Sequence, residues 1–467
     1  MEPAELMPLV RTHATQTLDE QVNSHIIPLL RSRPVSSERS PAELHSTADD
    51  LKSILERVGL ENVQILREGE SYPAVYGEYH SPLIGAPTLL VQGHYDGQPS
   101  DLKRWTVTHP HEPVIVTVNG ERRLYGRGAS DDLGQVFTHV VALDFYRKHK
   151  LPLPINLKFL FEGGGEVGSK DMDTLVEKHK DLLRADVVMI TDSAPGRMDH
   201  PVITTSGRGL VGFNVTLKTG TNNPHSGDNI AFNAVATLAA LLTSMKDYVT
   251  QRVLIPHFYD DVQDLSPRER EQINAMQFDT DLFRMNYGLQ QLVGEQGFTF
   301  NETMWHRPSY EIHEIRGGMA SNIIPTEVST YVTMRLVPRQ KPEKIGKLFV
   351  EELYHRAEIF GLQTSQLIVT SRSSSFPFNT STDHPSFRKA EQAMAAAFGT
   401  SVDYMGCGGT EPIVLVHQQI LKAPVIFNAY NSPSDHYHGD NESFSLDLGF
   451  IPGVVANVLF YELLAQH

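Results

Sequence analysis

The sequence predicts an α/β protein with a second, α+β domain inserted into the first. Short apolar runs alternate with helical segments as far as about residue 192. Near Gly207 the pattern changes to longer alternating strands, and near residue 380 the first pattern returns. A chain of 467 residues is also too long for one ordinary hydrophobic core, which favours two domains.

The first domain starts with helical periodicity over residues 15–60, which is broken at RSRPVSSERSP and ends at a glycine cap. Three apolar runs bounded by turn residues follow, TLLVQGHYD, INLKFLFEGGGE and ADVVMITDS. A helical segment, DDLGQVFTHVVALDFYRKH, lies between the first two runs. Strands and helices that alternate in this way form an α/β sheet with its functional residues at the strand ends.

The inserted domain is indicated by LVGFNVTLKT and STYVTMRLVP, which alternate as half-buried strands do, and by a helix, NAVATLAALLTSMKDYV, between them. A Ser/Thr-rich passage, TSRSSSFPFNTSTDHP, then returns the chain to the first domain. A helix, a strand and a closing helix, GFIPGVVANVLFYELLAQ, complete that domain. We therefore expect a discontinuous first domain, residues 1–206 and 380–467, with residues 207–379 as the insertion.

The composition is that of an ordinary globular protein, with 40% apolar and 21% charged residues. The net charge of −16 argues against nucleic acid or an anionic membrane as a partner. A single cysteine, Cys407, excludes an intrachain disulfide and fits a reducing compartment. The N-terminus lacks the features of a secretory signal, and no apolar run is expected to approach the ~20 residues of a membrane helix. These features predict a cytoplasmic protein.

Acidic and histidine side chains follow several of the apolar runs, at the points where the predicted strands end. They are His94, Asp96, Asp131, Asp132, Glu162, Glu166, Asp192, His436 and His438. Any one of them alone is as well explained as a cap or a surface group. Because strand ends in an open α/β sheet converge on one crevice, the repetition favours a shared site. Carboxylates and imidazoles are the ligands that zinc and manganese prefer, so this site is a candidate metal centre.

Five motifs in order resemble those of a known enzyme family: GHYDGQP, LYGRGASDDLG, FEGGGEVGS, HSG and HGDNES. The family is that of the dinuclear zinc peptidases, which includes carnosinase, aminoacylase, glutamate carboxypeptidase and succinyl-diaminopimelate desuccinylase. The resemblance covers essentially the whole chain. It implies a zinc-peptidase-like α/β catalytic domain, with a central mixed sheet flanked by helices, and an inserted α+β lid domain that also dimerises.

The resemblance further implies a metal-dependent hydrolase of the amide or peptide bond of a small carboxylate-bearing substrate. That substrate would be a dipeptide or an N-acyl amino acid, attacked by a hydroxide that bridges two divalent metal ions. Zinc would be the first choice of metal, with manganese or cobalt as alternatives. The metal ligands carried over by position are His94 and Asp192 for one ion, Glu166 and His438 for the other, and Asp131 between them.

Other residues take supporting roles in the same resemblance. Asp96 would orient the His94 imidazole, and the peptide bond before Asp132 would be cis. His225 would reach the active site of the partner subunit in a homodimer and stabilise the oxyanion there. Arg335 would hold the substrate carboxylate by paired hydrogen bonds. Without the family, His225 and Arg335 would be interpreted as ordinary surface residues. The remaining substrate contacts would be Asn322, Gly408, Gly409 and Thr410.

The third motif departs from the family at a position of direct chemical consequence. The family carries two consecutive acids there, first the general base and then a metal ligand. The register of FEG and GS places Gly165 at the base position and Glu166 at the ligand position. General acid–base catalysis typically contributes ~10²–10⁴-fold, so a glycine predicts a slower peptidase unless another group acts.

Three explanations of Gly165 are compatible with the sequence. Another residue supplies the base, with Glu411 in GCGGTEP as the candidate and Glu162 less favoured, because relatives that retain the base also have that acid. Alternatively, the protein is a base-less member that binds metal and ligand without hydrolysis. In the third explanation the site performs chemistry that needs no such base, for example acyl transfer or amide formation. Gly97, where relatives usually have valine, also predicts a substrate pocket of unusual shape.

Overall fold

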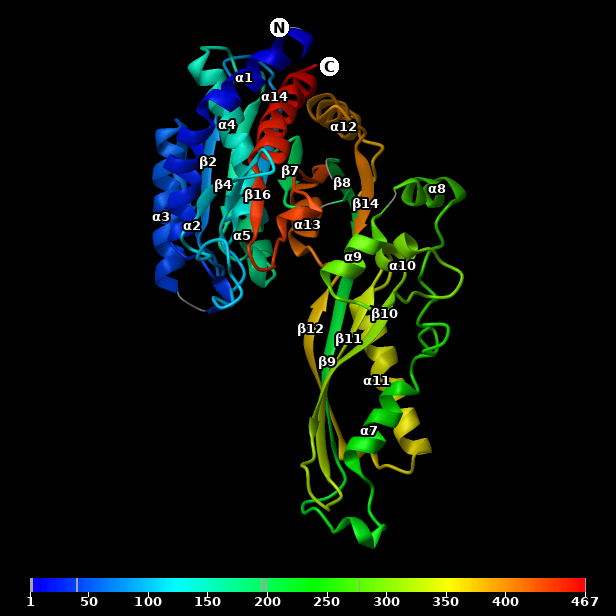
Figure 1. Ribbon diagram of the computed structural model, residues 1–467. Coiled ribbons are helices and arrows are strands. Elements are labelled where there is room, and N and C mark those ends of the chain that lie inside the picture. The colour runs from blue at the N-terminus through cyan, green and yellow to red at the C-terminus, as the bar shows by residue number, and fades with distance from the viewer. Residues whose placement is uncertain (1–2, 39–40, 195, 198–199, 277, 467) are drawn as a thin grey trace. The chain divides into compact units, whose positions relative to one another are not determined.

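The structure is a computed structural model that describes residues 3–38, 41–194, 196–197, 200–276 and 278–466 (Figure 1). The chain divides into two compact units. Unit 1 comprises Met1–Thr205, Thr380–Met405 and Pro412–His467, and unit 2 comprises Ser206–Asn379 and Gly406–Glu411. The segment Gly406–Glu411 differs from the sequence-based boundaries, which placed it in the first domain. It packs with unit 2 because Gly409 O accepts a hydrogen bond from Arg208 N at 2.9 Å.

Unit 1 is built on a mixed sheet, which confirms the predicted fold class. The strand order is β1 (Glu61–Leu66), β2 (Ala74–Tyr79), β6 (Asn156–Glu162), β3 (Thr88–His94), β7 (Val187–Thr191), β15 (Val425–Ala429) and β8 (Val202–Gly207). Two short strands pair with β8, β13 (Phe378–Asn379) and β14 (Asp403–Cys407). Strands β6, β3, β7 and β15 run parallel, whereas β2 and β8 are antiparallel to their neighbours. Strands β3, β6 and β7 are those predicted from the three apolar runs, and β15 is the strand predicted before the closing helix.

The helices of unit 1 cover this sheet. They are α1 (Pro3–Gln21), α2 (Ile27–Arg31), α3 (Pro41–Arg57), α4 (Gly134–Lys148), α5 (Met172–Lys178), α6 (Lys180–Leu183), α12 (Pro385–Phe398), α13 (Pro412–Val416) and α14 (Ile451–Ala465). Helix α14 packs against α1, α4 and α12, and α3 packs on β1 and β2 (Figure 1). Strand β3 is buried along almost its whole length, as its continuous apolar run predicts for a parallel strand covered on both faces. Helix α3 ends before Gly59, whose φ of +86° confirms the glycine cap.

The predicted closing helix at the C-terminus is confirmed, but its apolar run is longer than the sequence prediction allowed. Leu446–Ala465 is long and apolar enough to cross a membrane, by length and composition alone. In the structure, 72% of the most apolar stretch of this segment is buried inside the protein. A core helix that packs on all sides is apolar all round, because it has no face turned to water.

A small antiparallel sheet in unit 1 places one of the chemically important turns. Its strand order is β16 (Ser443–Ser445), β5 (Glu121–Tyr125) and β4 (Val114–Val118). Residues 126–133 leave β5 and run into α4, while β16 follows the loop that contains His438. The pairing of β16 with β5 therefore brings two distant parts of the chain side by side.

Unit 2 is an α+β unit, as predicted. Its antiparallel sheet has the order β10 (Ser309–Gly317), β11 (Glu327–Leu336), β9 (Gly209–Lys218) and β12 (Leu367–Ser375). Its helices are α7 (Ala234–Thr243), α8 (Pro267–Ala275), α9 (Thr280–Asn286), α10 (Phe300–His306) and α11 (Pro342–Ile359). Alternate residues of β9 and β11 share one apolar core with α7 and α11 (Figure 1).

Candidate metal centre

The five predicted metal ligands come from strand ends and turns of unit 1. They are His94 at the end of β3, Asp131 in the turn between β5 and α4, Glu166 in the turn after β6, Asp192 after β7 and His438 before β16. Strands β3, β6 and β7 are parallel neighbours, so their carboxyl ends lie at one edge of the sheet. The fold thus brings side chains that are hundreds of residues apart in the sequence to one place.

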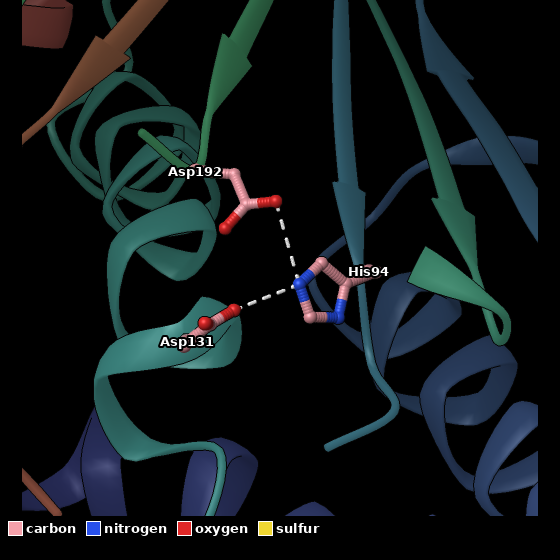
Figure 2. Close-up of side chains that lie close together, drawn as sticks. All are labelled: His94, Asp131 and Asp192. Carbon is pink, nitrogen blue, oxygen red and sulfur yellow. Dashed lines mark hydrogen bonds and ion pairs between the residues drawn. The ribbon is translucent and has the colours of Figure 1, made fainter. Parts of the chain in front are cut away.

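Figure 2 shows the first group of ligands, in which two carboxylates point at one imidazole nitrogen. Nε2 of His94 lies 2.9 Å from Oδ1 of Asp131 and 3.4 Å from Oδ2 of Asp192. The potential ligand atoms of these three residues all lie within 4.8 Å of one another. They can therefore face a common ion.

The second group of ligands shares Asp131 with the first. Nε2 of His438 lies 2.9 Å from Oδ2 of Asp131 and 3.0 Å from Oε2 of Glu166. The two carboxylate oxygens of Asp131 thus face different histidines, Oδ1 towards His94 and Oδ2 towards His438. A carboxylate that presents one oxygen to each of two ligand groups has the geometry of a bridge between two cations.

The electrostatics of the site fit divalent cations. Burial raises the pKa of Glu166 to about 7 and that of Asp192 to about 6, and Asp131 pushes both in the same direction. Burial also disfavours ionised Asp131, but the imidazoles of His438 and His94 hold its pKa well below the usual value. Buried carboxylates this close together repel one another when ionised, and a bound dication offsets that repulsion. Two imidazoles and three carboxylates are a donor set that zinc accepts.

Asp96 contacts both the His94 imidazole and the turn that carries Glu166. Nδ1 of His94 lies 2.9 Å from the Asp96 carbonyl oxygen and 3.2 Å from its Oδ1. The Asp96 carboxylate also accepts hydrogen bonds from Gly165 N at 3.0 Å and from Glu166 N at 3.2 Å. The peptide bond between Asp131 and Asp132 is cis, as the resemblance implied. These contacts agree with an orienting role for Asp96 and extend its contacts to the turn that holds Glu166.

Gly165 allows a close approach that sequence reasoning did not anticipate. A Cβ atom at this position would lie 2.6 Å from Cγ and 2.8 Å from Cβ of His94. Contacts that short do not persist between carbon atoms, so any side chain at 165 displaces either the turn or the imidazole. The glycine is therefore more than a flexible link between Glu162 and Glu166.

The residues predicted to contact substrate lie in unit 2. Nη1 of Arg335, on β11, donates a hydrogen bond of 2.7 Å to Oγ1 of Thr410, which follows Gly408 and Gly409. Burial lowers the pKa of Arg335, and the neighbouring Glu411 acts in the opposite direction. Cys407, which precedes Gly408, is buried.

The segments that contain His225 and Asn322 lie side by side in unit 2. His225 forms an isolated β-bridge with Ile323, and the Asn322 carbonyl accepts a hydrogen bond of 3.0 Å from Ser226 N. The sequence placed these two residues almost a hundred positions apart. Their proximity follows from the return of the chain between β10 and β11.

Three residues in the quoted motifs take part in the centre although the sequence analysis assigned them no role. Gln98 donates a hydrogen bond of 2.8 Å to Oε2 of Glu166. Arg127 and Glu442 form a buried ion pair of 2.7 Å beside the turn that holds Asp131. Each lies within a few residues of a predicted ligand, in GHYDGQP, LYGRG or HGDNES. Their position inside these motifs is the sequence signal that could have identified them as residues of the centre.

Replacing Glu162 with glutamine is expected to flatten the pH dependence of stability of the metal-free protein. Glu162 is buried at the end of β6, and burial, followed by the charge of Asp96, raises its pKa from 4.5 to about 8. An acid with a raised folded-state pKa stabilises the fold below the unfolded value of 4.5, and this contribution is lost as pH rises through the folded value of about 8. We expect the natural protein, relative to E162Q, to lose roughly 2–4 kcal/mol of unfolding free energy across that interval.

Urea unfolding of both proteins at a series of pH values, in the presence of chelator, measures this difference. Glu78→Gln is a suitable control, since Glu78 is only partly buried and its pKa is lowered rather than raised: burial acts upward, but hydrogen bonds from Tyr76 and Asn62 outweigh it. Parallel pH curves for the natural protein and E162Q would contradict the interpretation.

Comparison with known proteins places this geometry in a family. The family described as Peptidase family M20/M25/M40 matches residues 90–457. The chain is 29% identical to the Beta-Ala-His dipeptidase of Homo sapiens over 435 residues, which cover 90% of this chain and 84% of that protein. It is 26% identical to the Cys-Gly metallodipeptidase of Schizosaccharomyces pombe over 392 residues, which cover 82% of this chain and 80% of that protein.

Solved structures agree with the sequence comparisons. The crystal structure of human carnosine dipeptidase 1 superposes with a TM-score of 0.83 at 27% identity, covering 99% of both chains. The structure of the di-peptidase Dug1p from Saccharomyces cerevisiae gives a TM-score of 0.85 at 21% identity over 100% of both chains, and shows the same fold. The chain therefore belongs to the Peptidase family M20/M25/M40 and is a hydrolase of the metallopeptidase class that uses divalent metal ions.

Proposed function

We propose that this protein is a dinuclear metallodipeptidase that hydrolyses the peptide or amide bond of a small substrate with a free carboxylate. The observation that carries the proposal is the position of Asp131, whose two oxygens each lie 2.9 Å from a different histidine. A dipeptide is the preferred substrate class, because two relatives are a Beta-Ala-His dipeptidase and a Cys-Gly metallodipeptidase. An N-acyl amino acid presents the same amide and carboxylate groups and is the second candidate.

Two zinc ions are the proposed metals, with manganese or cobalt as alternatives. His94 and Asp192 would hold the first, Glu166 and His438 the second, and Asp131 would contact both. When bound, the ions supply Lewis-acid polarisation of the scissile carbonyl and acidify water at neutral pH. Asp96 fixes the His94 ring by the contact at Nδ1, which leaves Nε2 turned towards Asp131 and Asp192.

The substrate is oriented in this proposal by residues of unit 2. Arg335 binds the substrate carboxylate, and the hydrogen bond to Thr410 restricts the orientation of its guanidinium group. Gly408, Gly409 and Asn322 complete the contacts to the substrate. His225 of the partner subunit donates a hydrogen bond to the developing oxyanion.

Proton transfer to the leaving amine needs a group other than residue 165, because glycine has no titratable side chain. We propose Glu411 as the substitute acid, on the support that it adjoins the loop at Gly408–Thr410 and that an acid is absent at Gly165. The expected consequence is turnover that is slowed but not abolished, with intact substrate binding, because a substitute acid recovers only part of the ~10²–10⁴-fold that general acid–base catalysis contributes.

A homodimer through unit 2 is part of the proposal. Apolar side chains are exposed near His225 in the sequence and near Asn322: Ile230 is 89% exposed, Phe232 46% and Met319 69%. Exposed apolar groups of this size favour a protein partner, and a second copy would also receive His225. The single cysteine supports a cytoplasmic location.

A substrate panel tests the proposed function. The protein, loaded with zinc or manganese, is assayed with β-Ala-His, Cys-Gly, N-acetyl amino acids and the C-terminal amides of the same dipeptides. We expect hydrolysis of dipeptides that chelator abolishes and metal restores, with at least about tenfold lower kcat/KM for the amides because Arg335 loses its paired contact. Absence of hydrolysis of every dipeptide at full metal occupancy would overturn the proposal, and equal rates for acids and amides would remove Arg335 from it.

A further inference from the structure

A buried ion pair lies beneath the turn that carries Asp131. Arg127 precedes this turn and Glu442 precedes β16, and both side chains are inaccessible, with 4% and 0% exposure. Nη1 of Arg127 donates to Oε2 of Glu442 at 2.7 Å. A buried pair of opposite charges is strongly disfavoured unless further hydrogen bonds satisfy it, so its other contacts indicate what it holds in place.

The Glu442 carboxylate binds the backbone of the Asp131 turn. Oε1 accepts hydrogen bonds from Ser130 N at 2.9 Å and Asp131 N at 3.0 Å, while Oε2 accepts one from Gly128 N at 3.0 Å. The Glu442 carbonyl also accepts one from Gly126 N at 3.0 Å. One residue thus holds the backbone on both sides of Ser130 and directly at Asp131.

The Arg127 guanidinium binds the loop that carries His438. Its Nη2 donates to the Gly439 carbonyl at 3.0 Å and to the His438 carbonyl at 3.4 Å, and its Nε donates to Oγ of Ser100 at 3.0 Å. The planar guanidinium therefore holds the His438 loop through one nitrogen and Glu442 through another. Lysine cannot reproduce this arrangement, because its ammonium group is a single point.

These contacts bear on the second ligand group more than on the first. Arg127 and Glu442 hold the main chain at Asp131, which both groups share, and at His438, which belongs to the second group alone. His94 in the first group is held differently, through Asp96 at its imidazole and Asp132 at its main-chain nitrogen. The ion pair is thus placed to act on one metal position more than on the other.

We propose that Arg127 and Glu442 are positioning residues that fix Asp131 and His438 for the second metal ion. The inference rests on the proposed dinuclear site and adds two residues to it. Glu442→Gln keeps the shape of the side chain but replaces one acceptor oxygen by an NH₂ donor, which then faces either main-chain N–H groups or the guanidinium. Supporting residues of metal ligands contribute about 10–100-fold to metal affinity, so we expect a loss of that size at one site.

The experiment compares Glu442→Gln and Arg127→Lys with a control, Asp447→Asn. Asp447 accepts hydrogen bonds from the Arg122 guanidinium at 2.6 Å and from Arg122 N at 2.7 Å, so the control removes a similar carboxylate contact from the same small sheet. Zinc bound per chain is measured by equilibrium dialysis against graded chelator, and cobalt spectra report the two positions. We expect E442Q and R127K to bind one metal about 10–100-fold more weakly and the other with a clearly smaller loss of affinity, with D447N unchanged.

A second measurement needs no metal. In the metal-free protein, hydrogen exchange at the amides of Ser130 and Asp131 is expected to quicken at least about tenfold in E442Q relative to the natural protein and D447N. The one oxygen left in glutamine cannot accept from these two amides and also from Gly128 N and the Arg127 guanidinium, so the turn opens more readily. If E442Q does not fold, the metal measurement on R127K, in which the His438 and Gly439 carbonyls lose the guanidinium, tests the inference.

The possible outcomes separate this inference from the proposed function. The positioning role would be overturned if E442Q bound both metals with the affinities of the natural protein, or if its affinity for both metals fell by the same factor. Unchanged amide exchange would also overturn it. A natural protein that binds fewer than two metals would instead contradict the dinuclear site on which the inference rests.

Discussion

Asp131→Asn is expected to abolish dipeptide hydrolysis and to reduce the bound metal to one weakly held ion or none. Asparagine has the shape of aspartate, but its amide nitrogen would point protons at one of the two histidines that now face carboxylate oxygens. Each metal contributes several kcal/mol of transition-state stabilisation, so we expect the rate to fall on the order of 10³-fold or more. Elemental analysis and kcat/KM measured on the same preparation test this.

Asp403→Asn is the control for that experiment. Asp403 is also a buried aspartate of unit 1, but it pairs with Arg197 at 2.6 Å rather than with a histidine. The Asp403→Asn protein is expected to be somewhat less stable than the natural protein and to keep its bound metal and its activity. An Asp131→Asn protein that binds two ions and turns over dipeptides would show that Asp131 is not the bridge.

Two substitutions at position 165 are expected to separate two effects of the glycine, the room it leaves for His94 and the absence of an acid. Gly165→Glu and Gly165→Gln both introduce a Cβ atom, which would lie 2.6 Å from Cγ of His94 unless the turn shifts. Both variants should therefore bind the metal at His94 more weakly than the natural protein. Only the glutamate can also move a proton at this position, whereas Glu411 is present in both variants. We therefore expect kcat of the glutamate variant to exceed that of the glutamine variant by about tenfold or more at saturating metal, up to the ~10²–10⁴-fold that general acid–base catalysis contributes.

The ratio between these two variants is the informative quantity, because the steric disturbance of His94 is the same in both. A comparison of Gly165→Glu with the natural protein alone would mix the gain in proton transfer with the loss of metal. Equal kcat values for the two variants would mean that proton transfer does not pass through position 165 and would strengthen the case for Glu411. A Glu411→Gln protein without loss of activity would exclude Glu411 instead.

The fold class, and the convergence of the five side chains that we propose as metal ligands, could be predicted from the sequence, since both depend on patterns along the chain. Continuous apolar runs indicated the parallel strands, and each ligand lies at or shortly after the end of such a run or inside a recognisable motif. The segment Gly406–Glu411 could not be assigned correctly in this way, because its packing partners, Arg208 and Arg335, are far from it in sequence. The length of the apolar run at Leu446–Ala465 was also underestimated.

The contacts that hold the proposed ligands in place were less predictable from the sequence than the ligands themselves. Glu442 lies 311 positions from Asp131, and only the pairing of β16 with β5 brings the two together. The approach of Gly165 to His94 depends on the path of a short turn, which no periodicity describes. Three-dimensional proximity of this kind follows from packing, so motifs indicate the residues involved without indicating their partners.

Anomalous diffraction at the zinc edge, from crystals grown with saturating zinc, tests the dinuclear site most directly. We expect two peaks about 3.5–4 Å apart on opposite sides of the Asp131 carboxylate, one next to His94 and Asp192 and the other next to Glu166 and His438. A single peak, or peaks remote from Asp131 in crystals of protein that hydrolyses dipeptides, would contradict the account.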